Sequence, residues 1–396
     1  MFSGKKILLG VTGGIAAYKS AALLRDLQKA GAEVRVVLTD AATRFVGSET
    51  FSALSRIPVA SSIFGEGSDP DNWVRHVHWA EWADVFIIAP CTANTLGKIV
   101  NGLSDNMLTS MVTAARCPVA ICPTMDGQMY HSSAIQRNLR IAREDGYHII
   151  EPGEGYLASG LHDFGRLPEN DEILHHLARL VNTDKFLSGK KVLVTAGPTR
   201  EHIDPVRYLS NPSSGKTGVS FARAADMYGA EVTLLLGPGS LTPPPGIKVK
   251  RFESSEELFN LVEENWAHHD VLIMTAAVSD FRPALKESSK VKKDKAELTI
   301  SLERTTDILE WTGSNRGSHQ TVIGFAMETE DLENQARSKL ENKNLDWIAG
   351  NIISKGKTGF EVDQNELLVL GRNGERHEFK GDKSQIAGQM LAKIFS

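Results

Sequence analysis

Residues 6–38, KILLGVTGGIAAYKSAALLRDLQKAGAEVRVVL, contain the pattern that decides the fold. They comprise a short apolar run (Lys6–Val11), a glycine-rich turn, apolar residues at helical spacing (Ile15–Ala30) and a second apolar run (Glu33–Leu38). Apolar runs of this length on either side of an amphipathic helix are typical of a β-α-β unit. The sequence therefore predicts that the chain begins with an α/β domain.

The same pattern recurs after residue 190. Lys191–Gly197 and Glu231–Gly237 are predicted strands on either side of a helical stretch, Val219–Tyr228, and in both halves the helix ends in Gly-Ala-Glu-Val. Continuous apolar strands that alternate with helices indicate parallel sheets covered on both faces. We therefore expect two doubly wound, mainly parallel, Rossmann-like domains. The further predicted strands are Val85–Pro90, Val119–Thr124, Val271–Ala277, Thr321–Met327 and Asp346–Asn351.

The boundary between the two domains is expected within the polar stretch Val181–Lys190, because the helical pattern of Ile173–Leu180 stops there. The 396 residues suffice for two domains, since a typical domain has about 150. We assign residues 1–181 to the first domain and residues 187–396 to the second.

Composition excludes several classes of protein. A net charge of −5 gives no extended positive field for nucleic acid. Three cysteines without a CxxC pair indicate neither a disulfide framework nor a thiolate zinc site. The N-terminal run Ile7–Val11 is too short for a signal peptide, and no stretch approaches the roughly 18 apolar residues of a membrane span. We expect a soluble cytoplasmic protein that binds small molecules.

Two glycine-rich loops are candidates for binding phosphates at the carboxyl ends of parallel strands. Gly10–Gly14 lacks the GxGxxG spacing of dinucleotide sites, although Asp40 after the second strand leaves an NAD-dependent oxidoreductase as an alternative. Ser210–Thr217, SNPSSGKT, matches a P-loop except that serine replaces the first glycine. A standard P-loop ATPase is therefore not expected.

Further motifs occur in the same order as in one known family. The first half contains GVTGGIAAYK (Gly10–Lys19), His76 shortly before WAD (Trp82–Asp84), IAPCTANT (Ile88–Thr95), PTMDGQMY (Pro123–Tyr130) and ASGLHDFGR (Ala158–Arg166). The second half contains TAGPTREHIDPVRYLSNPSSGKTG (Thr195–Gly218), AAVSDF (Ala276–Phe281), SKVKK (Ser289–Lys293), GFAMET (Gly324–Thr329) and KNLD (Lys343–Asp346). Over nearly its whole length the chain resembles the bifunctional coenzyme A biosynthesis flavoproteins, the CoaBC or Dfp family.

This resemblance implies two successive reactions. The second domain would be a ligase that joins 4′-phosphopantothenate to cysteine through an acyl-cytidylate, with CTP as co-substrate and Mg²⁺ as metal. The first, flavodoxin-like domain would be an FMN-dependent decarboxylase that converts 4′-phosphopantothenoylcysteine into 4′-phosphopantetheine. Flavin sites in the family lie between subunits, so the resemblance also implies a homo-oligomer.

The resemblance implies the following residue roles in the ligase domain. Asn211 would handle the acyl-cytidylate, because an amide both donates and accepts hydrogen bonds; its alternative role is that of a turn residue before Pro212. Lys290, in the family's KxKK pattern, would contact the CTP phosphates, although most lysine runs are solvated loops. Asp280 would meet the nucleotide or its Mg²⁺. The other substrate-binding residues would be Met274, Thr275, Ala276, Thr306, Asp307, Ile308, Leu309, Phe325 (against the base), Lys339 and Lys343.

In the decarboxylase domain, His76 matches the active-site histidine of the family. His76 and His78 could also form a metal pair, but the sequence shows no third ligand. FMN would need one phosphate site, at which Gly13 and Gly14 let a helix N-terminus approach the phosphate. The flavin would also contact Thr92, Ala93 and Asn94, and the substrate would contact Asp126, Met129 and Arg166.

Two positions depart from the family pattern. Asp126 stands where most relatives have an asparagine that can donate a hydrogen bond to the substrate carboxylate. Ser159 stands where many relatives have a cysteine that protonates the enethiolate intermediate, and a serine hydroxyl is a far weaker acid than a thiol. These departures motivate an alternative, in which an active ligase carries a degenerate flavin domain that acts as a binding or assembly module.

Overall fold

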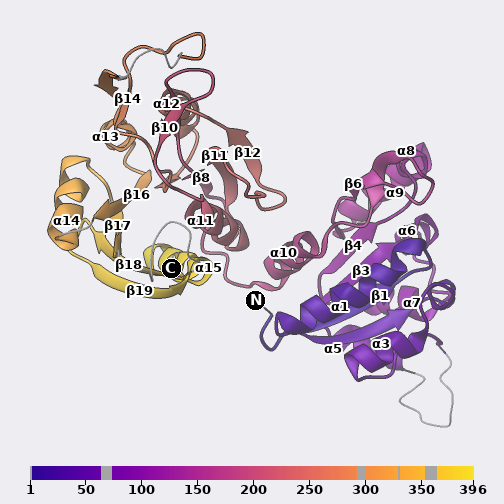
Figure 1. The fold of residues 1–396 in the computed structure, drawn as a ribbon. Coiled ribbons are helices and arrows are strands. Elements are labelled where there is room, and N and C mark those ends of the chain that lie inside the picture. Colours follow the sequence, from indigo (N-terminus) through magenta and orange to yellow (C-terminus); the bar gives the residue numbers. More distant parts are fainter. Residues whose placement is uncertain (1, 64–73, 292–298, 329–330, 353–363) are drawn as a thin grey trace. The chain divides into compact units, whose positions relative to one another are not determined.

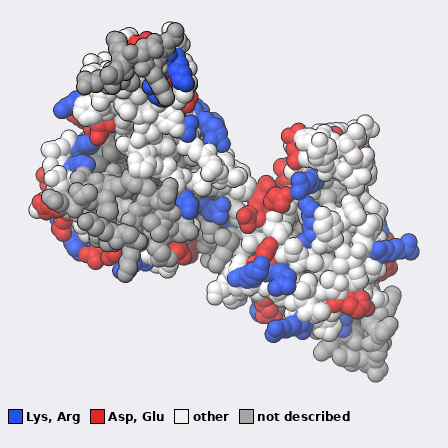
Figure 2. Space-filling view, viewed as in Figure 1, with Lys and Arg blue, Asp and Glu red and all other residues white. Residues whose placement is uncertain are grey.

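The computed structural model describes residues 2–63, 74–291, 299–328, 331–352 and 364–396. The chain forms two compact units, Met1–Thr183 and Asp184–Ser396, each with its own sheet (Figure 1). Among the described residues, no helix is both long enough and apolar enough to cross a membrane. On the face shown in Figure 2, acidic and basic side chains are interspersed among the described residues.

The first unit contains a five-stranded parallel sheet with the order β2-β1-β3-β4-β5. The strand order therefore changes direction between the neighbouring strands β1 and β3. Open α/β sheets bind ligands at such a point, beside the carboxyl ends of the two strands. The strands are β1 (Lys6–Val11), β2 (Glu33–Leu38), β3 (Val85–Cys91), β4 (Val119–Pro123) and β5 (His148–Ile149), and a separate antiparallel hairpin comprises β6 (Gly153–Tyr156) and β7 (His162–Arg166).

Helices cover both faces of this sheet. Right-handed crossovers place α1 (Lys19–Lys29), which leads to β2, and α7 (Met107–Ala114), which leads to β4, on opposite faces. Leu108 packs with Phe86 and Ile88 of β3, while Leu23 and Leu27 of α1 are fully buried. The remaining helices are η1 (Ile15–Tyr18), α2 (Asp40–Thr43), α3 (Ser48–Ser55), α5 (Arg75–Trp82), α6 (Ala93–Val100), α8 (Gly127–His131), α9 (Ser133–Glu144) and α10 (Asn170–Val181).

The second unit contains an eight-stranded sheet with the order β12-β11-β8-β13-β16-β17-β18-β19. Neighbouring strands from β12 to β17 are parallel, and β18 and β19 add an antiparallel edge. The strands are β8 (Lys191–Ala196), β11 (Glu231–Leu236), β12 (Lys248–Arg251), β13 (Val271–Met274), β16 (Thr321–Glu328), β17 (Trp347–Ile352), β18 (Gln364–Gly371) and β19 (Arg376–Asp382).

Helices cover both faces of this second sheet, and an apolar cluster lies between the sheet and the helices on each face. Phe221 of α11 (Lys216–Met227) and Met390 of α15 (Lys383–Phe395) belong to one cluster. Val262 of α12 (Ser255–Trp266) and Leu340 of α14 (Leu332–Asn342) belong to the other. The predicted fold class, two doubly wound α/β domains, is therefore confirmed. The unit also contains α13 (Ile308–Ser314) and two hairpins, β9 (Arg200–His202) with β10 (Tyr208–Ser210) and β14 (Phe281–Pro283) with β15 (Leu302–Arg304).

Candidate active sites

In the first unit, the loops that follow β1 and β3 are tied together. Thr12 Oγ1 donates to the Pro90 carbonyl at 2.8 Å and accepts from the Thr92 amide at 3.0 Å. These bonds hold Gly14 beside Thr92, so that a Cβ on Gly14 would lie 3.6 Å from the Thr92 methyl group. The glycine loop therefore lies at the carboxyl edge of the sheet, next to the start of α6.

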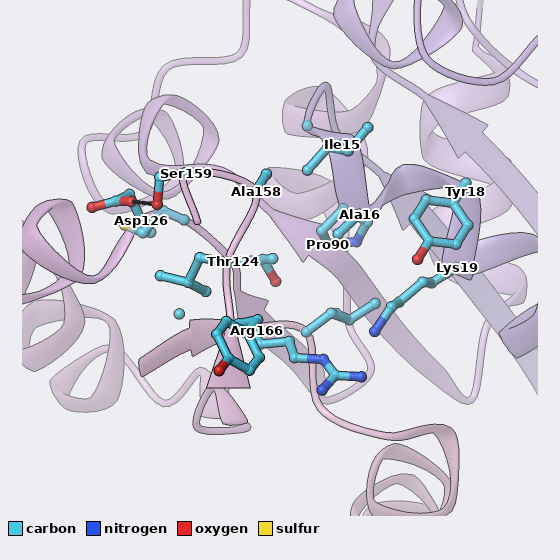
Figure 3. A pocket seen from close by; sticks show the side chains of 16 residues that line it. Ile15, Ala16, Tyr18, Lys19, Pro90, Thr124, Asp126, Ala158, Ser159 and Arg166 are labelled. Carbon is cyan, nitrogen blue, oxygen red and sulfur yellow. Dashed lines mark hydrogen bonds between the residues drawn. The ribbon is translucent and has the colours of Figure 1, made fainter. Parts of the chain in front are cut away.

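A cavity of about 560 Å³ opens at this edge. Four of the predicted residues line it: Gly14, Asp126, Ser159 and Arg166. Figure 3 shows Lys19 and Arg166 toward one end of the cavity and Asp126 with Ser159 toward the other. The cavity is thus electrostatically polarised, with cations at one end, where an anionic group of a ligand would bind, and a carboxylate at the other.

The two residues that depart from the family pattern contact each other. Ser159 Oγ donates a hydrogen bond to Asp126 Oδ2 at 2.7 Å. Asp126 Oδ1 accepts from the Gln128 amide at 3.1 Å and thereby caps α8. Because the single hydroxyl proton of Ser159 is directed at the carboxylate, the side chain presents only acceptor lone pairs elsewhere.

The hairpin β6-β7, which carries Ser159 at its turn, is docked on the loop after β4. The Met125 amide donates to the Gly165 carbonyl at 3.0 Å. Gly165 has a φ of +131°, and a Cβ there would lie 1.9 Å from the Met125 carbonyl oxygen. A Cβ on Gly127 would similarly lie 2.0 Å from Asp163 Oδ2. Position 165 therefore needs glycine because of its approach to the backbone, whereas a side chain at position 127 would require the Asp163 side chain to move.

None of the three cysteines lines the cavity that contains Ser159. Cys91 and Cys122 are buried in neighbouring strands, and burial raises the pKa of both thiols. Partial burial also raises the pKa of Cys117. A thiol with a raised pKa is a poor proton donor and a poor nucleophile.

The other predicted flavin and substrate residues do not line this cavity. A Cβ on Gly13 would lie 2.3 Å from the Ala41 Cβ, so this glycine allows close packing against α2. Thr92 caps α6 by accepting from the Thr95 amide, and Met129 is 49% exposed on α8. Ala93 and Asn94 occupy the first turn of α6, at the same carboxyl edge as the cavity.

His76 also lies outside this cavity, on the first turn of α5. Its Nδ1 is buried and has no hydrogen-bond partner, whereas His78 is exposed. Because α5 leads directly into the amino end of β3, its first turn lies toward the opposite, carboxyl edge of the sheet. In the described part of the chain, no three His, Cys, Asp or Glu side chains are grouped as a metal site would require.

In the second unit, two adjoining cavities of about 640 and 460 Å³ open at the carboxyl ends of β13 and β16. They share Val278 and four of the predicted residues: Ala276, Asp280, Phe325 and Lys339. The structure thus brings together predicted residues that are separated by more than 130 positions in the chain. Those lining the larger cavity alone are Met274, Thr306, Asp307, Ile308, Leu309 and Lys343, and those lining the smaller one alone are Asn211 and Thr275.

Hydrogen bonds and an ion pair fix several of these side chains. Asn211 Nδ2 donates to the Val278 carbonyl at 3.0 Å, which leaves its Oδ1 as an available acceptor. Asp307 caps α13 and also binds Lys343, whose Nζ lies 2.7 Å from Asp307 Oδ2. Phe325 packs edge-to-face on Phe221, with ring centroids 5.3 Å apart. The cavities therefore offer a fixed amide, a fixed ammonium group and an aromatic wall.

Two asparagines that the sequence analysis did not single out line the smaller cavity. Asn351 and Asn365 are 8% and 5% exposed, and each has a buried Oδ1 with no hydrogen-bond partner. Buried acceptors are nearly always paired, so a bound molecule with N–H or O–H groups would satisfy them. Asn351 ends a predicted strand, but no motif marks Asn365.

Lys290 lies outside the lining of both cavities. Its side chain is exposed on the segment that follows β14. The other two lysines of the KxKK pattern, Lys292 and Lys293, lie outside the described residues.

Comparison with known proteins gives matches over both units. Residues 1–182 match the family model described as Flavoprotein, and residues 187–396 match the DNA/pantothenate metabolism flavoprotein C-terminal domain. The chain is 43% identical, over 400 residues, to the coenzyme A biosynthesis bifunctional protein CoaBC of Bacillus subtilis, covering 100% of this chain and 97% of that protein. It is 40% identical to the CoaBC protein of Vibrio cholerae, with coverages of 99% and 98%.

Among solved structures, the chain is similar to the C-terminal domain of a coenzyme A biosynthesis bifunctional protein CoaBC. The two are 37% identical, with a TM-score of 0.46, and the match covers 53% of this chain and 96% of that one.

Proposed function

The chain belongs to the CoaBC family of bifunctional coenzyme A biosynthesis proteins, and we propose how its two units divide the two reactions. Residues 187–396 ligate 4′-phosphopantothenate to cysteine, with CTP as the activating nucleotide. Residues 1–181 then decarboxylate 4′-phosphopantothenoylcysteine to 4′-phosphopantetheine with the help of FMN. The observation that carries this proposal is the convergence of Asn211, Asp280, Phe325 and Lys343 on two adjoining cavities.

Activation of the carboxylate explains why the ligase unit needs cations. A carboxylate has no leaving group, so its oxygen attacks the α-phosphorus of CTP, and pyrophosphate leaves. Lys339 and Lys343 line the cavity where the negative triphosphate would bind, and Lys290 would add charge from outside it. Asp280, which faces both cavities, would bind Mg²⁺ together with the phosphates, as magnesium prefers.

Transfer to cysteine is the second step of ligation. The cysteine amine attacks the acyl carbon, CMP leaves, and a proton is lost from nitrogen. Asn211 has its Nδ2 bound to the Val278 carbonyl, so its Oδ1 is the atom available to orient the attacking amine.

FMN fits the first unit because Gly14, which has no side chain, and two cations, Lys19 and Arg166, line the cavity beside the glycine loop. Thr92, Ala93 and Asn94 would contact the flavin from the start of α6. When bound, FMN supplies the oxidation of the substrate thiol that lets CO₂ leave. Arg166 would bind an anionic group of the substrate, and His76 would move a proton at the reacting atoms.

We further propose a homo-oligomer in which a neighbouring copy completes the flavin site. The lining residues Ile15, Tyr18 and Tyr156 are 60%, 60% and 79% exposed, which is unusual for large apolar and aromatic side chains at a cavity. His76 lies outside this cavity with an unpartnered Nδ1. Both observations agree with a flavin site to which a neighbouring copy contributes its His76.

A second candidate function remains for the first unit, that of a binding or assembly module. It is supported by the Ser159 to Asp126 hydrogen bond, because the hydroxyl proton points away from a substrate. Mass spectrometry of a reaction with phosphopantothenate, cysteine and CTP tests both functions. We expect CMP, pyrophosphate and phosphopantetheine. Accumulation of phosphopantothenoylcysteine alone would favour the module, and absence of that amide would contradict the ligase.

A further inference from the structure

Asp204 is a fully buried carboxylate in the turn between β9 and β10. Its Oδ1 accepts hydrogen bonds from the amides of Val206 and Arg207, both at 2.8 Å. Its Oδ2 accepts from the Val291 amide at 3.2 Å and lies 3.0 Å from Arg207 Nη2. Burial alone would raise the pKa of Asp204, but the three backbone hydrogen bonds outweigh it and lower the pKa. The carboxylate is therefore ionised and held in one orientation.

The Val291 contact fixes the segment that carries Lys290. Arg207 Nη2 donates to the Val291 carbonyl at 2.6 Å, so both backbone polar groups of Val291 are bound to the β9-β10 turn. The Glu287 amide donates to the Ile203 carbonyl at 2.9 Å, which attaches the same segment at a second point. Lys290 lies between these two attachments, and its own side chain stays exposed.

The other side of the same hairpin leads to Asn211. Strand β10 ends at Ser210, and Asn211 follows directly and lines the smaller cavity. We propose that Asp204 is a positioning residue of the ligase: its Oδ1 shapes the hairpin that presents Asn211, and its Oδ2 holds the backbone next to Lys290. The proposal rests on the proposed roles of Asn211 and Lys290 in the ligation.

Asp204→Asn separates the two functions of the carboxylate. The asparagine retains one oxygen for the Val206 and Arg207 amides, but its NH₂ group cannot accept from Val291. We expect pyrophosphate release in the absence of cysteine to slow at least about tenfold, because the Lys290 segment shifts relative to the nucleotide. Transfer from preformed acyl-cytidylate to cysteine should change less than about twofold, because the turn that leads to Asn211 keeps its hydrogen bonds.

Glu201→Gln is the matched control. Glu201 is also a buried carboxylate on this hairpin, but its Oε1 accepts from the Ser255 amide at the start of α12. Both half-reactions of this variant should stay within about twofold of wild type, with a melting temperature similar to that of Asp204→Asn. The double variant Asp204→Asn/Lys290→Gln should release pyrophosphate no more slowly than Lys290→Gln alone, since Asp204 acts through Lys290.

Three results would overturn the role of Asp204: additive losses in the double variant, equal slowing of both half-reactions by Asp204→Asn, or the same loss in Glu201→Gln. Hydrogen exchange measures the hydrogen bond between the Val291 amide and Asp204 directly. The Val291 amide proton should exchange faster in Asp204→Asn than in the wild type. Normal pyrophosphate release by Lys290→Gln would instead overturn the proposed role of Lys290. A slow Lys290→Gln with a normal Asp204→Asn would overturn only the role of Asp204.

Discussion

Asp126 and Ser159 are 33 positions apart in the chain, yet their side chains form one hydrogen bond. In the sequence they were two separate departures from a family pattern. In the structure, an asparagine at position 126 could also accept from Ser159, but a cysteine at position 159 would place its thiol against the Asp126 carboxylate. A neighbouring negative charge raises the pKa of a thiol and makes it a weaker acid. The two departures are therefore chemically compatible with each other.

This pairing predicts different effects for single and double substitution. Ser159→Cys alone should improve formation of phosphopantetheine only slightly, because the Asp126 carboxylate raises the pKa of the thiol and makes it a weaker proton donor. Asp126→Asn/Ser159→Cys should accelerate it by about tenfold or more, since one or more pK units of acidity are regained. Mass spectrometry under air should show an oxidised enethiol product in the wild type that decreases in the double variant.

His76→Asn serves as the control for this series and should abolish CO₂ release in every background. If the wild type already forms clean phosphopantetheine at a rate that the double variant does not change, the proton comes from another donor. Ser159 would then serve only to hold the hairpin to α8.

The candidate sites could be predicted wherever short motifs carry them. Asp280 follows β13 and Phe325 lies in β16 of the parallel sheet, Asn211 follows the hairpin strand β10, and the structure places all three at the same cavities. Asn365 could not be found in this way, because a buried amide within β18 has no sequence signature. Asp204 belongs to a quoted motif, but its contact with Val291 depends on how two hairpins pack.

At the element scale, the sequence analysis predicts most of the buried strands, although it does not predict β18, whose residues Leu367–Leu370 are also buried. Strand β3 is buried at all seven positions and therefore appears as an unbroken apolar run. Strand β19 was missed, because its residues alternate between exposed and half-buried and include five charged or histidine side chains. The helix expected over Ile15–Ala30 begins as a 3₁₀ turn, η1, before α1, as helix N-termini often do.

The hairpin β6-β7 depends on Gly165. Gly165→Ala would place a Cβ 1.9 Å from the Met125 carbonyl oxygen at a φ of +131°. We expect a loss of about 1–3 kcal/mol in the unfolding free energy of residues 1–183. Decarboxylation should also decrease at least about tenfold, because the displaced hairpin carries Ser159 and Arg166 away from the cavity. Chemical denaturation and product analysis measure the two effects.

Gly160→Ala is the matched control on the same hairpin. Gly160 also has a positive φ, +84°, but a Cβ there would meet no atom within 4 Å. This variant should lose about 1 kcal/mol from backbone strain and retain most of its decarboxylase activity. Equal losses in both variants would show that the strained backbone, and not the contact with Met125, determines the position of the hairpin.

At the scale of the whole molecule, each unit has its own sheet and its own apolar clusters. The ligase cavities lie within the second unit, and Asn211, Asp280 and Phe325 reach them from one chain. The flavin unit is different, since His76 lies outside the cavity that Arg166 lines. The two activities should therefore differ in their dependence on association between copies.

Mixed oligomers test this difference. His76→Asn and Arg166→Ala should each abolish decarboxylation alone, because each removes one half of every site. In a mixed oligomer, the cavity of a His76→Asn copy keeps Arg166 and receives an intact His76 from its Arg166→Ala neighbour. In a mixed dimer one of the two sites is then intact, so the isolated mixed dimers should regain about half of the wild-type activity.

Co-expression of the two variants with different affinity tags isolates the mixed oligomers, and CO₂ release measures the recovery. Ligation should stay at the wild-type level in all of these samples, because its cavities lie in the other unit. If His76 serves the cavity of its own chain, every mixed oligomer contains only defective sites, and decarboxylation stays absent. That result would place the proton transfer within one copy and require α5 to move toward the cavity of the same chain.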